Sequence, residues 1–209
     1  MSDSDDDVPQ LSADTFLALQ EFYQEQEERE KRLVSSADEN ATFDEDWQLS
    51  QFWYDDVTIE SLVNVALKEV GPDAKIALIS CPTLYNKIKQ NMSDTGKVTL
   101  YEYDPRFAIY GSDFVPYDYK SPLDIPRDQA SFYDLVIADP PFLSDECLTK
   151  TALTIKFLTS AKIMLCTGAV MENLAQRLLD LKKTPLKPQH KNNLANEFYC
   201  YSNFNVSNI

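Results

Sequence analysis

The chain has 209 residues, of which 44% are hydrophobic and 25% are charged, as is typical of a globular protein with one sizeable core. Its formal net charge is −15, and residues 1–46 carry 15 Asp and Glu against three basic residues. No stretch reaches the roughly 20 apolar residues of a membrane span, and the acidic N-terminus is unlike a basic or apolar targeting peptide. We therefore expect a monomeric, cytoplasmic protein with no membrane partner.

Glycine and cysteine exclude several kinds of site. The chain has four glycines, and none is spaced for a G-x-G-x-x-G or G-x-x-x-x-G-K-[ST] phosphate loop. The four cysteines form no C-x-x-C pair, which argues against a disulfide scaffold and a zinc knuckle. His190, the single histidine, lies in a Lys- and Asn-rich loop and is interpreted as a surface residue. We therefore expect no metal site.

The N-terminal region is predicted to be an extension of a separate domain. Leu11 and Phe16 bracket Ser12 in the manner of a hydrophobic staple around a helix cap, which predicts a helix from Ser12. Its continuation to residue 32 is polar on all sides and precedes a flexible link. We predict an acidic, partly disordered extension over residues 1–42 and one domain over residues 43–209. The acidic run is either a solubilising end or a segment that attracts a basic protein.

Hydrophobic patterns in the remaining chain predict a parallel α/β sheet with helices on both faces. Residues 58–70 have helical periodicity and end at Gly71 and Pro72. Apolar runs at residues 75–80, 98–103, 113–117, 133–138 and 162–167 predict strands, and residues 83–92, 144–158 and 169–181 predict helices. Residues 184–189 and 197–205 predict two consecutive strands, which leave no room for a helix and therefore form an antiparallel hairpin.

The sequence D-P-P-F follows the fourth predicted strand, at Asp139, Pro140, Pro141 and Phe142. Two prolines fix extended backbone and remove two N–H donors, so the Asp139 carboxylate and the Pro140 carbonyl are left as acceptors beside an aromatic face. Such a group suits an amine, whose N–H bonds it can accept while the aromatic ring covers a developing cation. A strand that simply ends in a Pro-Pro turn would have the same sequence.

Five motifs resemble one known family: W-Q-L-S-Q-F-W-Y (47–54), Y-E-Y-D-x-R-F (101–107), A-D-P-P-F-L-S-x-E-C-L (138–148), L-C-T-G (165–168) and N-L-A-N-E-F (193–198). They are similar to the elongation factor 1-alpha lysine methyltransferase 1 family, which was formerly labelled as adenine-specific DNA methyltransferases. The resemblance implies a Rossmann-like sheet of seven strands with a terminal antiparallel hairpin. It also implies S-adenosyl-L-methionine as cofactor and a lysine of elongation factor 1-alpha as acceptor, with D-P-P-F as the catalytic motif.

Candidate cofactor-binding residues follow the predicted strands, because ligands of such sheets lie beyond the carboxyl ends of the strands. Glu102 or Asp104 is placed to bond ribose hydroxyls, and Glu102 is preferred since the resembling families use the first acid. Asp118 is placed to accept from an adenine amine, although an ordinary turn would also use an Asp there. The remaining candidates are Ser80, Cys81 and Thr83, where a Thr83-capped helix would receive a carboxylate, and Asp139.

Aromatic residues before the first helix are candidates for the acceptor site. Trp53 and Tyr54 belong to a segment too rich in aromatics to stay exposed, so they either pack on the domain or line the acceptor site with Phe142. Of these, Tyr54 is expected to face the site.

Two other functions remain open. An adenine-specific nucleic-acid methyltransferase shares D-P-P-F but needs a basic track, which is missing here, so no nucleic-acid partner is expected. A non-catalytic binding module would keep the sheet but bind no cofactor, as Cys81 and Pro82 in place of glycines would suggest.

Overall fold

The computed structural model describes residue 20, residues 43–192 and residues 194–206. The described residues from 43 onward lie in one compact unit, residues 42–209. The predicted acidic extension lies outside the described residues except for Gln20, so its helix and the domain boundary stay predictions. No helix in the described ranges is long and apolar enough to cross a membrane.

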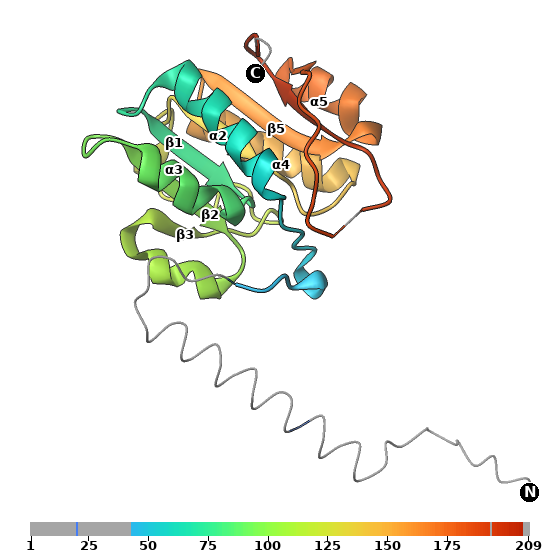
Figure 1. The fold of residues 1–209 in the computed structure, drawn as a ribbon, viewed down its shortest axis with the longest axis horizontal. Coiled ribbons are helices and arrows are strands. Elements are labelled where there is room, and N and C mark those ends of the chain that lie inside the picture. Colours follow the sequence, from blue (N-terminus) through green and yellow to red (C-terminus); the bar gives the residue numbers. More distant parts are fainter. Residues whose placement is uncertain (1–19, 21–42, 193, 207–209) are drawn as a thin grey trace, which may run out of the picture. The chain divides into compact units, whose positions relative to one another are not determined.

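Seven strands form one mixed sheet, as the sequence predicts (Figure 1). Their order is β3-β2-β1-β4-β5-β7-β6; the first five pair in parallel, and β7 pairs antiparallel with both β5 and β6. The strands are β1 (Lys75–Ile79), β2 (Lys97–Glu102), β3 (Phe114–Pro116), β4 (Leu135–Ala138), β5 (Lys162–Gly168), β6 (Lys182–Lys183) and β7 (Phe198–Ser202). The order reverses between β1 and β4, and a sheet of this kind has its ligand crevice at that point.

Helices cover both faces of the sheet (Figure 1). α2 and α3 pack side by side on one face, and α4 and α5 contact each other on the opposite face. The α-helices are α2 (Asp56–Val70), α3 (Tyr85–Asn91), α4 (Asp145–Leu158) and α5 (Glu172–Leu179). The described residues also form short 3-10 helices: η1 (Trp47–Leu49) before α2, and η2 (Pro82–Leu84), η3 (Pro105–Asp113), η4 (Arg127–Gln129) and η5 (Ala169–Met171) between the later elements.

The apolar runs form strands because both faces of the sheet are buried. Along β1, Ala77 and Ile79 belong to the core cluster shared with α4 and α5. Ile76 and Leu78, with the opposite orientation, are equally buried and belong to the face covered by α2 and α3. Fully buried strands therefore give continuous apolar sequence, which is why the prediction found them.

Caps set the helix boundaries. α2 begins two residues before the predicted start at residue 58, because Asp55 is its N-cap: Asp55 Oδ1 accepts from the Thr58 amide at 2.7 Å. The predicted end at Gly71 is confirmed, and a φ of 81° there explains the glycine. The predicted helix over residues 144–158 is confirmed as α4, and Ser144 is its N-cap, since its hydroxyl accepts from the Cys147 amide at 3.2 Å.

The terminal hairpin has the predicted antiparallel pairing, but its first strand was misplaced. β6 comprises Lys182 and Lys183, not residues 184–189. The chain turns early because Asp180 has a left-handed conformation (φ 54°) after α5. Pro185 and Pro188 lack amide N–H groups, so the segment after β6 cannot continue a regular ladder.

Candidate active site

A cavity of about 550 Å³ lies at the carboxyl ends of β1 to β4. It is walled by the loops that follow these strands, by residues 48–53, and by His190, Leu194, Ala195, Asn196 and Phe198. Ten of the candidate residues named from the sequence line it: Trp53, Ser80, Cys81, Thr83, Glu102, Asp118, Asp139, Pro140, Pro141 and Phe142. The structure thus brings together side chains from both ends of the domain.

The loop after β1 takes a conformation usually reserved for glycine. Ser80 has a φ of 54°, and its amide donates to the Tyr101 carbonyl at 2.9 Å, which fixes the turn beside the cavity. Thr83 is not a helix cap as expected: it lies inside η2, whose N-cap, Cys81, makes no side-chain cap bond. Cys81 is buried instead, with its thiol directed to the Ile137 carbonyl at 3.5 Å.

We expect Ser80→Gly to stabilise the fold by about 0.5–1 kcal/mol, because glycine occupies positive φ without a Cβ clash. Ser80→Val should destabilise it by about 1–2 kcal/mol, since a β-branched residue is strongly disfavoured there. Urea unfolding of both variants measures the difference. Equal stability of the two would show that φ at residue 80 is not constrained.

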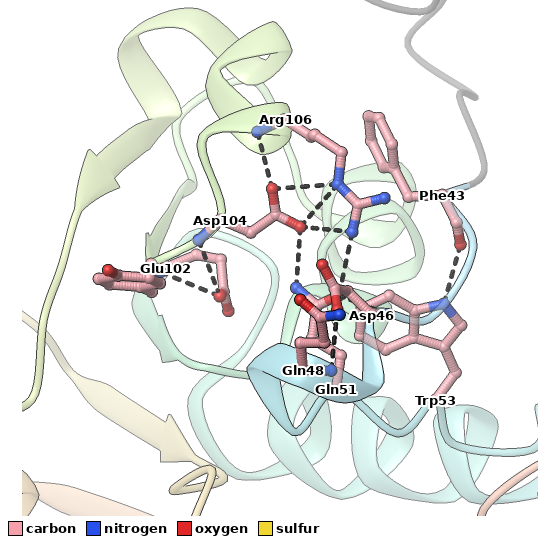
Figure 2. A network of polar contacts seen from close by, with 9 residues as sticks. Phe43, Asp46, Gln48, Gln51, Trp53, Glu102, Asp104 and Arg106 are labelled. Atoms are coloured by element: carbon pink, nitrogen blue, oxygen red, sulfur yellow. Dashed lines mark hydrogen bonds and ion pairs between the residues drawn. The ribbon is translucent and has the colours of Figure 1, made fainter. Parts of the chain in front are cut away.

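The two acids at the end of β2 have separate environments (Figure 2). Glu102 lines the cavity and is 5% exposed; its Oε1 accepts from the amides of Tyr103 at 2.9 Å and Asp104 at 3.2 Å. Asp104 does not line the cavity and pairs with Arg106 at 2.6 Å. Among the described residues, Glu102 is therefore the acid of this pair that a ligand in the cavity can reach.

Burial separates their pKa values as well. It raises the pKa of Glu102 to about 7, although the two backbone amides oppose the shift. Burial also disfavours the charge of Asp104, but hydrogen bonds from Arg106 and Gln51 outweigh it and hold the pKa of Asp104 below its ordinary value. Asp104 thus has the surroundings of a permanently charged structural residue.

Gln51, which the sequence analysis did not name as a candidate, connects residues 48–53 of the cavity wall to the loop that follows β2 (Figure 2). Its Nε2 donates to Asp104 Oδ2 at 2.8 Å, and its Oε1 accepts from Arg106 Nη2 at 3.0 Å. The same oxygen accepts from the Asp46 amide at 3.0 Å. Trp53 is fixed nearby by its indole N–H, which donates to the Phe43 carbonyl at 2.8 Å. This network holds residues 46–53 against the cavity.

Asp139 is the first residue after β4, and its amide donates to the Ile79 carbonyl at 2.9 Å. Its Oδ2 accepts from the Tyr54 hydroxyl at 2.5 Å. Tyr54 does not line the cavity, contrary to the prediction that it faces the acceptor: it is 1% exposed and lies behind Asp139. Burial raises the pKa of Asp139 to about 7, the Tyr54 hydrogen bond lowers it, and the charge of Glu102 raises it.

The raised pKa of Asp139 makes stability depend on pH. The unfolded carboxyl has a pKa of about 3.9, so folding takes up a proton between that value and about 7, and stability is lost as the pH rises through this window. Asp139→Asn removes this cost. We expect its stabilising effect to be about 2 kcal/mol larger at pH 8 than at pH 5, as measured by urea unfolding. An effect that does not change with pH would contradict a raised pKa.

Phe142 and Asp118 complete the wall beside Asp139. Phe142 is 42% exposed, and its ring meets that of Tyr119 edge-on at 5.8 Å. Asp118 Oδ1 accepts from the Lys120 amide at 2.8 Å, so Asp118 has the turn role that the sequence left open and also lines the cavity.

His190 is not the surface residue that the sequence suggested. It is half-buried and lines the cavity, with its ring 5.2 Å from that of Tyr54 and 4.8 Å from that of Phe198. Burial lowers the pKa of His190 below its ordinary value, although the negative charges of Glu45 and Asp55 act in the opposite direction. The prediction failed because the polar loop around His190 folds back on residues 53–55, a contact with no local sequence signal.

The sheet order defines a Rossmann-like α/β fold, and the D-P-P-F motif lies at the end of β4, beside the order reversal where such folds bind their ligands. Among solved structures, the fold is similar to that of PH1948 from Pyrococcus horikoshii, described as an RNA methyltransferase (TM-score 0.52, 15% identity, 83% of this chain and 96% of that chain). The branched-chain polyamine synthase C9 mutein of Thermus thermophilus is similar at a TM-score of 0.55 (14% identity, 83% of this chain and 61% of that chain).

Comparison with proteins of similar sequence identifies the family more specifically than the fold does. The chain is 48% identical to EEF1A lysine methyltransferase 1 of Gallus gallus, over 98% of each chain, and of Homo sapiens, over 98% of this chain and 96% of the human protein. A family model described as "Probable N6-adenine methyltransferase" matches residues 45–206. The chain belongs to the family of this model and to the EEF1A lysine methyltransferase 1 family.

Proposed function

We propose that this protein transfers a methyl group from S-adenosyl-L-methionine to a lysine side chain of elongation factor 1-alpha. The names of its relatives support this acceptor. The observation that carries the proposal is the cavity itself. Glu102 ends β2 and Asp139 follows β4, the two strands on either side of β1, and Pro140 and Phe142 line the cavity with them.

The cavity fits this cofactor by its donor and acceptor groups. Among its described lining residues only Lys120 and His190 are basic, so it suits a cofactor that carries no phosphate. Oε1 of Glu102 accepts the hydrogen bonds from the Tyr103 and Asp104 amides, and no described protein group donates to its Oε2. Glu102 would hold the ribose hydroxyls, Asp118 would accept from the adenine amine, and Ser80, Cys81 and Thr83 would contact the amino-acid end. The cofactor, when bound, supplies an electrophilic methyl group on a positively charged sulfur.

The residues around Asp139 prepare the acceptor. A lysine ammonium has no lone pair, so the nitrogen must lose a proton before it can attack. The Asp139 carboxylate and the Pro140 carbonyl accept the N–H bonds of the neutral amine and orient its lone pair. Phe142, exposed at the cavity wall, covers the cation that develops on the nitrogen. Trp53 lines the same cavity and would contact the aliphatic part of the lysine.

The family description names adenine, which makes a nucleic-acid acceptor the second candidate. An enzyme of that kind binds a phosphate backbone through clustered Lys and Arg. The described cavity lining offers no such cluster, and it includes the acids Glu102, Asp118 and Asp139. These features favour a positively charged lysine over a polyanion. We further propose that the protein is cytoplasmic, because translation, in which the proposed substrate takes part, occurs in the cytoplasm; the expectation of a monomer stays a prediction.

A transfer assay decides between these acceptors. The purified protein is incubated with cofactor labelled in its methyl group and with either unmodified elongation factor 1-alpha or adenine-containing DNA and RNA. We expect label in the protein substrate, on a lysine located by mass spectrometry, and none in nucleic acid. Label in adenine would overturn the proposal. No label anywhere and no cofactor-induced rise in melting temperature would identify a non-catalytic binding module.

A further inference from the structure

Tyr54 is held rigidly at a position that touches Asp139 from behind the cavity. Its backbone forms an isolated β-bridge with His190, and the neighbouring bonds run from the Lys191 amide to the Trp53 carbonyl at 2.8 Å and from the Asp55 amide to the Gln189 carbonyl at 3.0 Å. Its ring packs against His190, and its side chain is 1% exposed. The position of the hydroxyl is therefore fixed by two distant segments of the chain.

We propose that Tyr54 is a positioning residue for methyl transfer, whose hydroxyl holds Oδ2 of Asp139 so that Oδ1 remains for the acceptor amine; this inference rests on the function proposed above. The 2.5 Å bond occupies one carboxylate oxygen and restrains the rotation of the carboxylate. With the Pro140 carbonyl, the second oxygen then provides the two acceptors that a neutral primary amine requires. Tyr54 itself does not reach the cavity, so it acts through Asp139.

Tyr54 also favours the ionised form of Asp139. Five titratable groups surround this carboxyl: Tyr54, Cys81, Glu102, Cys166 and, behind Tyr54, His190. Burial holds the pKa of Cys81 well above the ordinary thiol value, and a hydrogen bond with Cys200 together with burial does the same for Cys166, so both thiols are neutral. The charge of Glu102 raises the pKa of Asp139, and the Tyr54 hydroxyl lowers it. Removing the hydroxyl should therefore raise the pKa of Asp139.

Tyr54→Phe tests both roles and keeps the ring. We expect kcat with the protein substrate at pH 7 to fall about tenfold or more, while the cofactor dissociation constant stays within about twofold of wild type. The acid limb of the kcat/KM profile should move up by about one pH unit, because this profile follows the free enzyme. A merely structural tyrosine would not move that limb.

Tyr133→Phe is the matched control. Tyr133 is a buried tyrosine outside the cavity lining, and its hydroxyl bonds with Tyr101 at 2.9 Å and Gln129 at 2.8 Å. Its loss should lower the melting temperature and leave the pH profile unchanged. A second measurement needs no activity: Tyr54→Phe should change the melting temperature less in an Asp139→Asn background than in wild type, since the charged acceptor is then already removed.

The outcomes separate this inference from the proposed function. If wild type transfers methyl groups but Tyr54→Phe keeps both kcat and the acid limb, or if its effects on melting temperature and those of Asp139→Asn simply add, Tyr54 has no positioning role. If wild type methylates no lysine, the proposed function fails first, and the melting-temperature cycle still tests the Tyr54–Asp139 bond.

Discussion

Asp139→Ala should abolish methyl transfer and leave cofactor binding in place. The carboxylate lies at the end of β4 among the groups proposed to hold the acceptor amine, whereas Glu102 and the loop after β1 are proposed to hold the cofactor. Without an acceptor for its N–H bonds the amine is not oriented, and kcat should fall at least about 100-fold. Calorimetry with the cofactor and a transfer assay measure the two properties separately.

Asp134→Ala provides a control at the opposite end of the same strand, β4. Asp134 lies just before the amino end of β4, where its exposed carboxylate accepts from the Lys75 amide at 2.8 Å, away from the cavity lining. Its removal should leave kcat within about twofold of wild type, as for a surface substitution. Normal turnover of Asp139→Ala would exclude Asp139 from the acceptor site.

Glu102→Gln should weaken the cofactor rather than the chemical step. Charged hydrogen bonds contribute about 1.5–3 kcal/mol each, so the dissociation constant should rise at least about tenfold. Because the pKa of Glu102 is raised to about 7, the wild-type dissociation constant should also increase as the pH falls below 7, when the carboxyl takes up its proton. This pH dependence should disappear in Glu102→Gln, and isothermal calorimetry between pH 5.5 and about 8.5 detects it.

Asp104→Asn distinguishes the two acids of this loop. Asp104 is bonded to Gln51 and Arg106, so its substitution should lower the melting temperature through the loss of charged bonds. Its effect on the cofactor dissociation constant should be smaller than that of Glu102→Gln. A large loss of affinity in Asp104→Asn with an unchanged melting temperature would mean that Asp104, and not Glu102, binds the ribose.

The sheet and the D-P-P-F motif could be predicted because their signals are local. A strand buried on both faces requires a continuous apolar run, as in β1, and two prolines after β4 stop that run wherever the chain goes next. Once the strand order is assumed, residues that follow neighbouring strands must lie at one edge. This reasoning placed Asp139 and the pair Glu102 and Asp104 at that edge, and the resemblance to known families then favoured Glu102 over Asp104.

The parts that could not be predicted depend on contacts between distant segments. Gln51 is an ordinary polar residue in sequence, and its function in the fold arises from Asp104, 53 residues later. Tyr54 was expected to face the acceptor, but its hydroxyl donates a hydrogen bond to Asp139, 85 positions away in the sequence. His190 was assigned to the surface because polar neighbours usually indicate exposure, yet its backbone forms a β-bridge with the buried Tyr54, and it is therefore half-buried. No periodicity or spacing contains these pairings.

Two outer walls of the cavity come from opposite ends of the domain: residues 48–53, and His190 with residues 194–196 and Phe198. The chain next to His190 is bonded to the first wall, since the Lys191 amide donates to the Trp53 carbonyl at 2.8 Å. During synthesis, β1 to β5 leave the ribosome well before residue 189 does, so the central sheet can assemble while the cavity still lacks a wall. Contacts of such long sequence separation also form late in folding, because closing the intervening loop costs entropy first. The newly made protein therefore completes its binding site last, and a chain ending before residue 189 would lack one wall of the cavity as well as β7, the antiparallel partner of β5.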